Sequence, residues 1–363
     1  VEAEVHLDNG RSASSISPSG ASTGAFEAHE LRDHDKNKFL GKSVNIAVEN
    51  INKKISSKLK GLDSEDQENI DRVLIDLDGS ENKSNLGANA TLAVSLANSK
   101  CSALSKNKSL FKYLGNSFSL PIPLMNIING GVHADNDLNI QEFMIRPDSA
   151  KNFMDAIEKC YVVIQNLKKL LKLNKMLTNV GDEGGFAPSL NTNEQALNLI
   201  VDAIEKSNLK SGKDITICLD IAANELINDK GEYSIYSKNY TSVEDNINYY
   251  KKLTSNYPIK SIEDPFAEED WDAWSKLTNE IGNEVQIVGD DLFVTNSKRL
   301  SKGIKEKSAN CILVKPNQIG TLTETLEVIS MAKAANFNTI ISHRSGDTED
   351  TFIADLASAT MSS

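Results

Sequence analysis

The sequence predicts an α/β barrel preceded by a smaller α+β domain, and a regular cadence of chargeable residues is the main reason. In the second half of the 363-residue chain, five short apolar runs end on a residue that can carry charge, namely Asp220, Glu263, Asp290, Lys315 and His343. The steps between these residues are 43, 27, 25 and 28 positions, and a helix-like stretch fills each gap. A strand, a helix and their loops need about that length, and a barrel of parallel strands gathers reactive groups at its strands' C-terminal ends.

The first third of the chain has a different pattern, which predicts the smaller domain. Residues 1–7 alternate between apolar and polar, Asp8-Asn9-Gly10 is typical of a hairpin turn, and residues 11–16 could form the returning strand. Apolar residues at steps of four and three predict an amphipathic helix over 44–59. An alanine-rich helix is expected over 87–105.

The change of pattern places the domain boundary near residue 118. We expect the α+β domain over 1–118 and the barrel over 119–363. Two further strand-like runs, 123–130 and 141–147, precede the five regular units and bring the expected strands to seven. Because a barrel of this type closes with eight strands, the sequence predicts a barrel that lacks its eighth.

Composition excludes several classes of partner. The net charge of −12 argues against binding to nucleic acid or to an anionic membrane, since both require a basic face. No run approaches the length of a membrane span, and the acidic N-terminus is not a signal peptide. The four cysteines lack the spacing of a metal or redox motif and are expected to be buried, reduced thiols. We therefore expect a cytoplasmic protein.

Three acidic residues predict a metal site. Asp220, Glu263 and Asp290 offer hard oxygen ligands from three successive strand ends, with no cysteine beside them, and that ligand set suits Mg²⁺. The alternative is three solvated carboxylates that begin loops. Lys315 ends an apolar strand and could serve as a base near such a metal, or it could pair with one of the carboxylates.

Other candidate residues lie in glycine-rich loops or at strand ends. Glu183 in GDEGG could act as an acid opposite the base, or it could belong to a plain turn. His133, in NGGVHAD, is either a site residue or a structural histidine. Gln141 and Glu142 begin a strand whose first residues should lie at the same open end of the barrel. A further strand end carries the imidazole of His343, the guanidinium of Arg344 and the hydroxyl of Ser345. Together these groups suit a phosphate or carboxylate.

Several motifs, taken together, resemble those of enolase, the glycolytic phosphopyruvate hydratase. They cover nearly the whole chain in the family's order and spacing, and read SGASTG, NGGVHAD, IQEFMI, NVGDEGGFAP, SIEDPFAEEDW, VGDDLFVTN, LVKPNQIGT and SHRSGDTEDTFIADL. The resemblance implies an enolase-type barrel, a small phosphorylated carboxylate substrate, two Mg²⁺ ions per site and a homodimer.

The resemblance also implies a role for each matching residue. Asp220, Glu263 and Asp290 would hold the tighter Mg²⁺, and Ser22 would help to bind the second. Lys315 would remove the C2 proton of 2-phosphoglycerate, while Glu183, helped by Glu142, would protonate the leaving hydroxyl. Arg344 and Ser345 would grip the phosphate, with His133, Gln141 and His343 lining the site.

The chain departs from the family pattern at both ends. It lacks the DSRGNPTV-like segment that the family has before VEAEV, and it stops after ADLASATMSS, before a GQIKTG-like strand whose lysine contacts the substrate. We therefore expect a chain truncated at both ends. Two alternatives to an active enolase stay open: an inactive or non-catalytic enolase fragment, and a related Mg²⁺-dependent barrel enzyme that removes a proton next to another carboxylate.

Overall fold

The alternating N-terminal segment folds into the predicted hairpin. In the computed structural model, which describes residues 1–20 and 23–363, β1 (Glu2–His6) pairs antiparallel with β2 (Ser12–Ile16). In the turn, the Gly10 N–H donates to the Leu7 carbonyl over 3.0 Å, and Gly10 has a φ of 79°. Glycine adopts this left-handed conformation without steric cost, which explains the Asp-Asn-Gly signal.

Helices follow the hairpin, as predicted. They are α1 (Asn45–Glu49), η2 (Asn50–Ile55), α2 (Ser56–Leu59), α3 (Gln67–Asp78), α4 (Ala88–Ser105) and α5 (Leu110–Leu114). The helix predicted over 44–59 is present, but η2 is a π-helical segment inside it. The alanine-rich α4 is buried on nearly every face and packs against β1 and β2, because its small side chains allow close approach.

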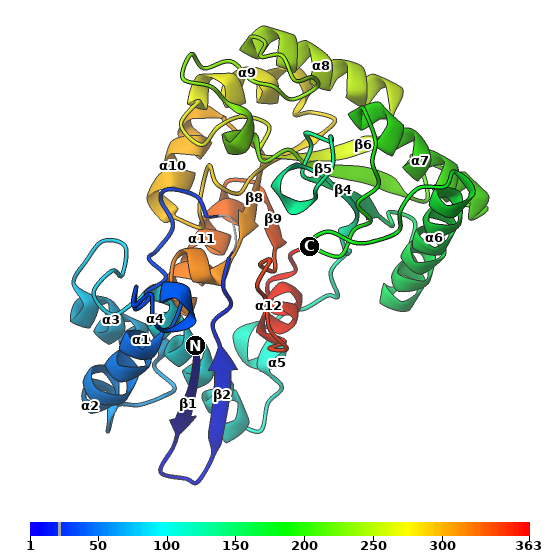
Figure 1. Ribbon diagram of the computed structural model, residues 1–363. Coiled ribbons are helices and arrows are strands. Elements are labelled where there is room, and N and C mark those ends of the chain that lie inside the picture. The colour runs from blue at the N-terminus through cyan, green and yellow to red at the C-terminus, as the bar shows by residue number, and fades with distance from the viewer. Residues whose placement is uncertain (21–22) are drawn as a thin grey trace. The chain divides into compact units, whose positions relative to one another are not determined.

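A seven-stranded sheet carries the second half of the fold (Figure 1). Its strands, in spatial as in sequence order, are β3 (Met125–Asn129), β4 (Glu142–Arg146), β5 (Thr216–Asp220), β6 (Ile259–Glu263), β7 (Gln286–Gly289), β8 (Cys311–Val314) and β9 (Asn338–Ile341). The β3–β4 and β4–β5 pairs are antiparallel, whereas β5–β6 and β6–β7 are parallel. The strand order and the alternation of strands with helices confirm the predicted barrel class, with seven strands among the described residues.

Helices alternate with the strands after β4. They are α6 (Phe153–Leu173), α7 (Asn193–Lys206), α8 (Val243–Asn256), α9 (Trp271–Ile281), α10 (Ser297–Glu306), α11 (Leu322–Ala334) and α12 (Phe352–Thr360). Short helical turns add η1 (Phe39–Gly41), η3 (Gly131–His133), η4 (Ala223–Leu226) and η5 (Pro316–Gln318). Among the described residues, no helix combines the length and apolarity needed to cross a membrane.

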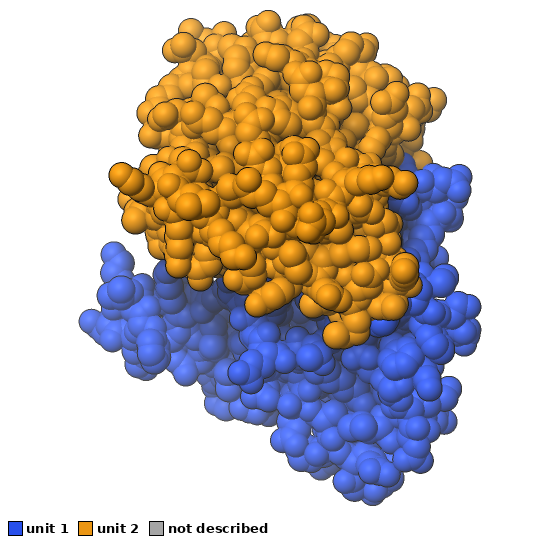
Figure 2. Space-filling model, turned by 90° about the vertical axis from the view of Figure 1, so that its right-hand side faces the viewer, with its two compact units in different colours: residues 1–120, 293–301, 312–362 blue, residues 121–292, 302–311, 363 orange. Residues whose placement is uncertain are grey.

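The chain divides into two compact units, drawn in different colours in Figure 2. Unit 1 comprises residues 1–120, 293–301 and 312–362, and unit 2 comprises residues 121–292, 302–311 and 363.

Asp350 ties three segments of unit 1 together. Its Oδ2 accepts hydrogen bonds from the Ser15 hydroxyl (2.6 Å) and the Ile16 N–H (2.9 Å), while its Oδ1 pairs with the Lys100 ammonium at 2.5 Å. Burial raises the pKa of Asp350, but the hydrogen bonds from Lys100, Ser15 and Ile16 outweigh it and leave the pKa below its usual value.

Replacing Asp350 by asparagine should therefore destabilise the fold in a pH-dependent way. A carboxylate with a depressed pKa adds stability above its unfolded-state pKa, and that stability is lost as pH falls through the folded-state value. We expect Asp350→Asn to lower the free energy of unfolding by about 2 kcal/mol at pH 7, with the difference from wild type shrinking below pH 4. Urea unfolding at pH 7, 5 and 3 measures this, with exposed Glu2→Gln as the control. A constant difference across that range would contradict the assignment.

Candidate functional site

Three of the predicted site residues lie at the same level of three adjacent strands in unit 2. Glu142 of β4 is paired with Asp220 of β5, and Asp220 is paired with Glu263 of β6. Glu263 is in turn level with Val288 of β7, and Asp290 comes one residue after that strand ends. Because paired residues in a sheet point to the same face, the structure brings these carboxylates together at one edge of the sheet.

Asp220 is held in place by two hydrogen bonds. Its Oδ2 accepts from the Gln141 side-chain amide at 2.9 Å, and its Oδ1 accepts from the Ala222 N–H at 3.0 Å. Both Asp220 and Gln141 are buried. We expected Gln141 to line the site, and in the structure its side-chain amide donates a hydrogen bond to Asp220.

Asp264 is a residue that the sequence reasoning missed. Its two carboxylate oxygens accept hydrogen bonds from the backbone N–H groups of Asp290 and Asp291, each over 2.9 Å. Asp264 has a φ of 41°, a left-handed conformation that is uncommon outside glycine. This buried carboxylate thus fixes the start of the loop that carries Asp290.

The acidic residues of this edge form a group that could hold a metal ion. Ligand oxygens of Asp264, Asp290 and Asp291 all lie within 4.8 Å of one another, a group that does not include Asp220 or Glu263. Burial, together with the charges of Asp291, Asp290 and Asp220, raises the pKa of Asp264 well above its usual value. A divalent cation would offset this repulsion, and an all-oxygen donor set is the one that Mg²⁺ prefers.

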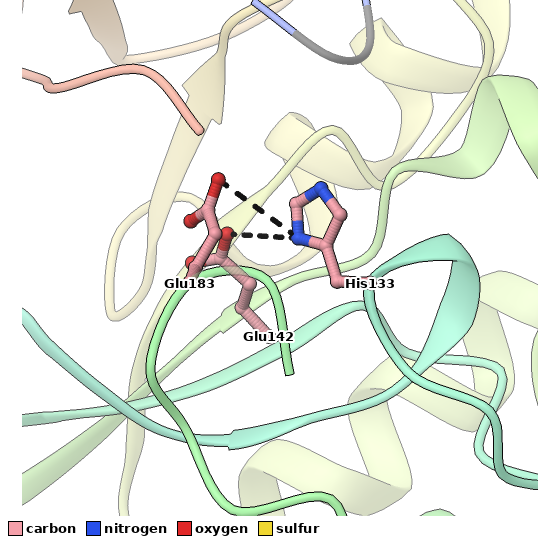
Figure 3. Close-up of side chains that lie close together, drawn as sticks. All are labelled: His133, Glu142 and Glu183. Carbon is pink, nitrogen blue, oxygen red and sulfur yellow. Dashed lines mark ion pairs between the residues drawn. The ribbon is translucent and has the colours of Figure 1, made fainter. Parts of the chain in front are cut away.

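A second group joins a histidine to two carboxylates, as Figure 3 shows. His133 Nδ1 lies 3.7 Å from Glu142 Oε1 and 3.9 Å from Glu183 Oε1. His133 is 5% exposed, and neither ring nitrogen makes a hydrogen bond within the described part of the chain. The structure thus gathers three predicted site residues from η3, from the start of β4 and from the glycine-rich loop.

Glycines in the loop over 179–188 allow it to lie against η3. A Cβ on Gly181 would come within 2.5 Å of the His133 carbonyl oxygen, and one on Gly185 within 2.7 Å of the Asn129 amide oxygen. The Asp182 N–H donates to the His133 carbonyl over 3.1 Å. These glycines therefore allow the loop to place Glu183 beside His133.

The remaining predicted residues belong to unit 1. Lys315 follows β8 directly and is partly exposed. Its backbone N–H donates to the Thr295 hydroxyl over 2.9 Å. His343 is exposed and Ser345 is half-buried, whereas Arg344 between them is 4% exposed.

Arg344 has a partner that the sequence did not reveal. Its guanidinium pairs with both carboxylate oxygens of Glu27, which follows the glycine/serine segment 17–24. The only sequence signal for this contact is that Glu27 lies close to the SGASTG motif. Ser22, predicted as a metal ligand in that segment, lies outside the described residues.

Comparison with known proteins gives matches over nearly the whole chain. The family model described as "Enolase, N-terminal domain" matches residues 1–114, and the one described as "Enolase, C-terminal TIM barrel domain" matches residues 117–363. A curated protein named enolase, from Pelagibacter ubique (strain HTCC1062), is 59% identical over 364 residues. The match covers 100% of this chain and 86% of that relative.

Proposed function

This chain belongs to the enolase family, whose reaction is the reversible dehydration of 2-phosphoglycerate to phosphoenolpyruvate, and we propose how its own side chains divide that reaction. The observation that carries the proposal is the alignment of Glu142, Asp220 and Glu263 across three adjacent strands, with Asp290 just beyond the fourth. This alignment supplies metal ligands and a proton-transfer group from one edge of a rigid sheet.

In this proposal, the tighter of two Mg²⁺ ions would be held by Asp220, Glu263 and Asp290. Ser22 would help to hold the second. Bound Mg²⁺ would stabilise the negative charge that develops on the substrate carboxylate. Gln141 keeps Asp220 oriented, and Asp264 keeps Asp290 in place through the backbone N–H. These contacts orient the Asp220 carboxylate and fix the backbone that carries Asp290.

Lys315 is the proposed base. The C2 proton of 2-phosphoglycerate is a weak acid, because its removal adds charge to a group that is already anionic. Lys315 would accept this proton at Nζ, which requires the neutral amine. Its backbone is fixed by the Thr295 hydroxyl, and Pro316 follows as the first residue of η5, so the side chain starts from a rigid point.

Glu183 is the proposed acid, with Glu142 as its helper. The leaving C3 hydroxyl must receive a proton, and two carboxyl groups beside one buried histidine can share the proton that one of them donates. His133 Nδ1 lies within 4 Å of both acids, so a protonated imidazole would stabilise whichever one is ionised.

Arg344 and Ser345 are the proposed phosphate ligands, and His133, Gln141 and His343 line the substrate site. A guanidinium is the side chain best suited to a phosphate, since it donates two parallel hydrogen bonds. We further propose a homodimer in the cytoplasm and retain the division into domains at 1–118 and 119–363.

Turnover of the authentic substrate tests the proposal. With 2-phosphoglycerate and Mg²⁺, the protein should produce the ultraviolet absorbance of the enol product, and chelation of the metal should abolish the signal. Enol product formation that persists after chelation would contradict the metal assignment, and no product at any Mg²⁺ concentration would contradict the activity.

A further inference from the structure

In unit 1, the buried carboxylate of Glu27 holds Arg344, the arginine that we propose as a ligand of the substrate phosphate. Arg344 Nη1 donates to Glu27 Oε2 over 2.9 Å, and Nη2 donates to Glu27 Oε1 over 3.2 Å. The side chains of Arg344 and Glu27 are only 3% and 8% exposed. A bidentate pair of this kind fixes the plane of the guanidinium as well as its position.

Two neighbours restrict the guanidinium further. Nη1 also donates to the Asn317 side-chain oxygen over 3.1 Å. On another side, a Cβ on Gly20 would come within 2.0 Å of Arg344 Nη2, so no larger residue fits there unless the guanidinium moves. Backbone hydrogen bonds in both directions between Ser19 and Gly346, of 3.2 and 2.9 Å, hold Gly20 beside the arginine.

Glu27 also connects this arginine to the segments that carry other proposed site residues. Its Oε1 accepts from the Gly24 N–H over 3.1 Å, at the end of the segment that contains Ser22. The same oxygen accepts from the Gln318 amide over 3.4 Å, and Gln318 accepts a 2.7 Å hydrogen bond from the Thr295 hydroxyl. The same Thr295 hydroxyl accepts a hydrogen bond from the backbone N–H of Lys315. One hydrogen-bond network therefore connects Glu27 and Arg344 to the residue proposed as the base.

We propose that Glu27 is a positioning residue for the reaction, whose carboxylate orients the Arg344 guanidinium for the substrate phosphate and ties Gly24 to it. The proposal rests on the phosphate-binding role proposed above for Arg344. Glu27 acts through Arg344 and takes no part in proton transfer. Its loss should therefore weaken phosphate recognition and leave the chemical step nearly intact.

For Glu27→Gln, the change in charge and the change in orientation predict opposite effects on phosphate affinity. Removing a negative charge beside Arg344 would by itself strengthen the binding of an anion. Losing one of the two Glu27 acceptor oxygens would weaken that binding, because the arginine must be reoriented when phosphate binds. We expect orientation to dominate, since both side chains are buried and a glutamine amide would face a guanidinium N–H donor.

The experiment measures KM for 2-phosphoglycerate, kcat, and competitive inhibition by inorganic phosphate. For Glu27→Gln we expect KM and the phosphate inhibition constant each to rise about tenfold, the pattern of lost uniform binding, with kcat changed less than about threefold. Glu27→Asp, which keeps the charge, should recover part of the loss. Gly20→Ala should reproduce the effect by displacing the guanidinium while Glu27 stays charged.

The controls separate this proposal from its premise and from simple destabilisation. Glu324→Gln breaks another ion pair of unit 1, the 2.6 Å pair with buried Lys83, and should leave KM and phosphate inhibition unchanged. If Arg344→Ala leaves phosphate inhibition unchanged, the role of Arg344 is wrong and this inference falls with it.

If Arg344→Ala weakens phosphate inhibition but Glu27→Gln and Gly20→Ala do not, or if Glu27→Gln strengthens it, the positioning role alone is refuted. Should Glu27→Gln fail to fold, Gly20→Ala decides by the same criterion.

Discussion

Replacing Lys315 by alanine is expected to lower kcat by about 10²–10⁴-fold, the range that general acid–base catalysis contributes. The alanine removes the only group that we assign to the C2 proton, while the strand before it keeps its apolar residues. The backbone hydrogen bond from residue 315 to the Thr295 hydroxyl does not depend on the side chain, so the local fold should persist. KM should change much less than kcat, because the base acts in the transition state.

Two further variants make this prediction specific. Lys315→Arg should be as inactive as Lys315→Ala, because a guanidinium stays protonated and cannot accept the proton. Lys260→Ala removes an exposed lysine near the start of β6 and should leave kcat unchanged. Steady-state assays on the three proteins suffice. An arginine variant with near wild-type kcat would show that position 315 supplies charge rather than a base.

Replacing Asp290 by alanine is expected to raise the Kd for Mg²⁺ by more than about 100-fold, since changing even an indirect partner of a metal ligand typically costs about 10–100-fold. The variant removes one of three proposed carboxylate ligands. It keeps the backbone N–H that donates to Asp264, so the loop after β7 should remain anchored. The effect should therefore come from the lost ligand and not from a displaced loop.

Calorimetric titration with Mg²⁺ measures this prediction without depending on turnover. Asp290→Asn, with nearly the same shape, should also bind weakly because the charge is lost. Asp229→Asn, at an exposed position between η4 and α8, provides the matched control and should bind as wild type does. Wild-type affinity in both Asp290 variants would rule out Asp290 as a ligand.

The five strands from β5 to β9 could be predicted from the sequence because they alternate with helices in a regular cadence. All five predicted apolar runs are strands, although β7, β8 and β9 end one or two residues before Asp290, Lys315 and His343. The chain turns there, and these residues begin the loops. Strand spacing could thus place the acids near one another, but not the exact geometry of their side chains.

The supporting residues could not be predicted because they depend on contacts that leave no periodic pattern. Asp264 is adjacent to Glu263, yet its role follows from a left-handed backbone that turns its carboxylate towards two N–H groups. Glu27 meets Arg344 from 317 positions away in the chain. A burial pattern or a motif indicates neither contact. The π-helical segment η2 could likewise not be predicted from the sequence, because its apolar spacing fits an α-helix equally well.

Exchange of the substrate's C2 proton with solvent tests the central claim most directly, because it reports proton removal even when no product forms. In deuterated buffer with Mg²⁺ and 2-phosphoglycerate, NMR should show deuterium entering C2 with the wild-type protein. Glu183→Gln should block dehydration yet retain exchange, since the acid acts after the proton has left. Lys315→Ala should show neither. Exchange that persists in Lys315→Ala, or that disappears in a folded Glu183→Gln, would contradict the division of roles between these two residues.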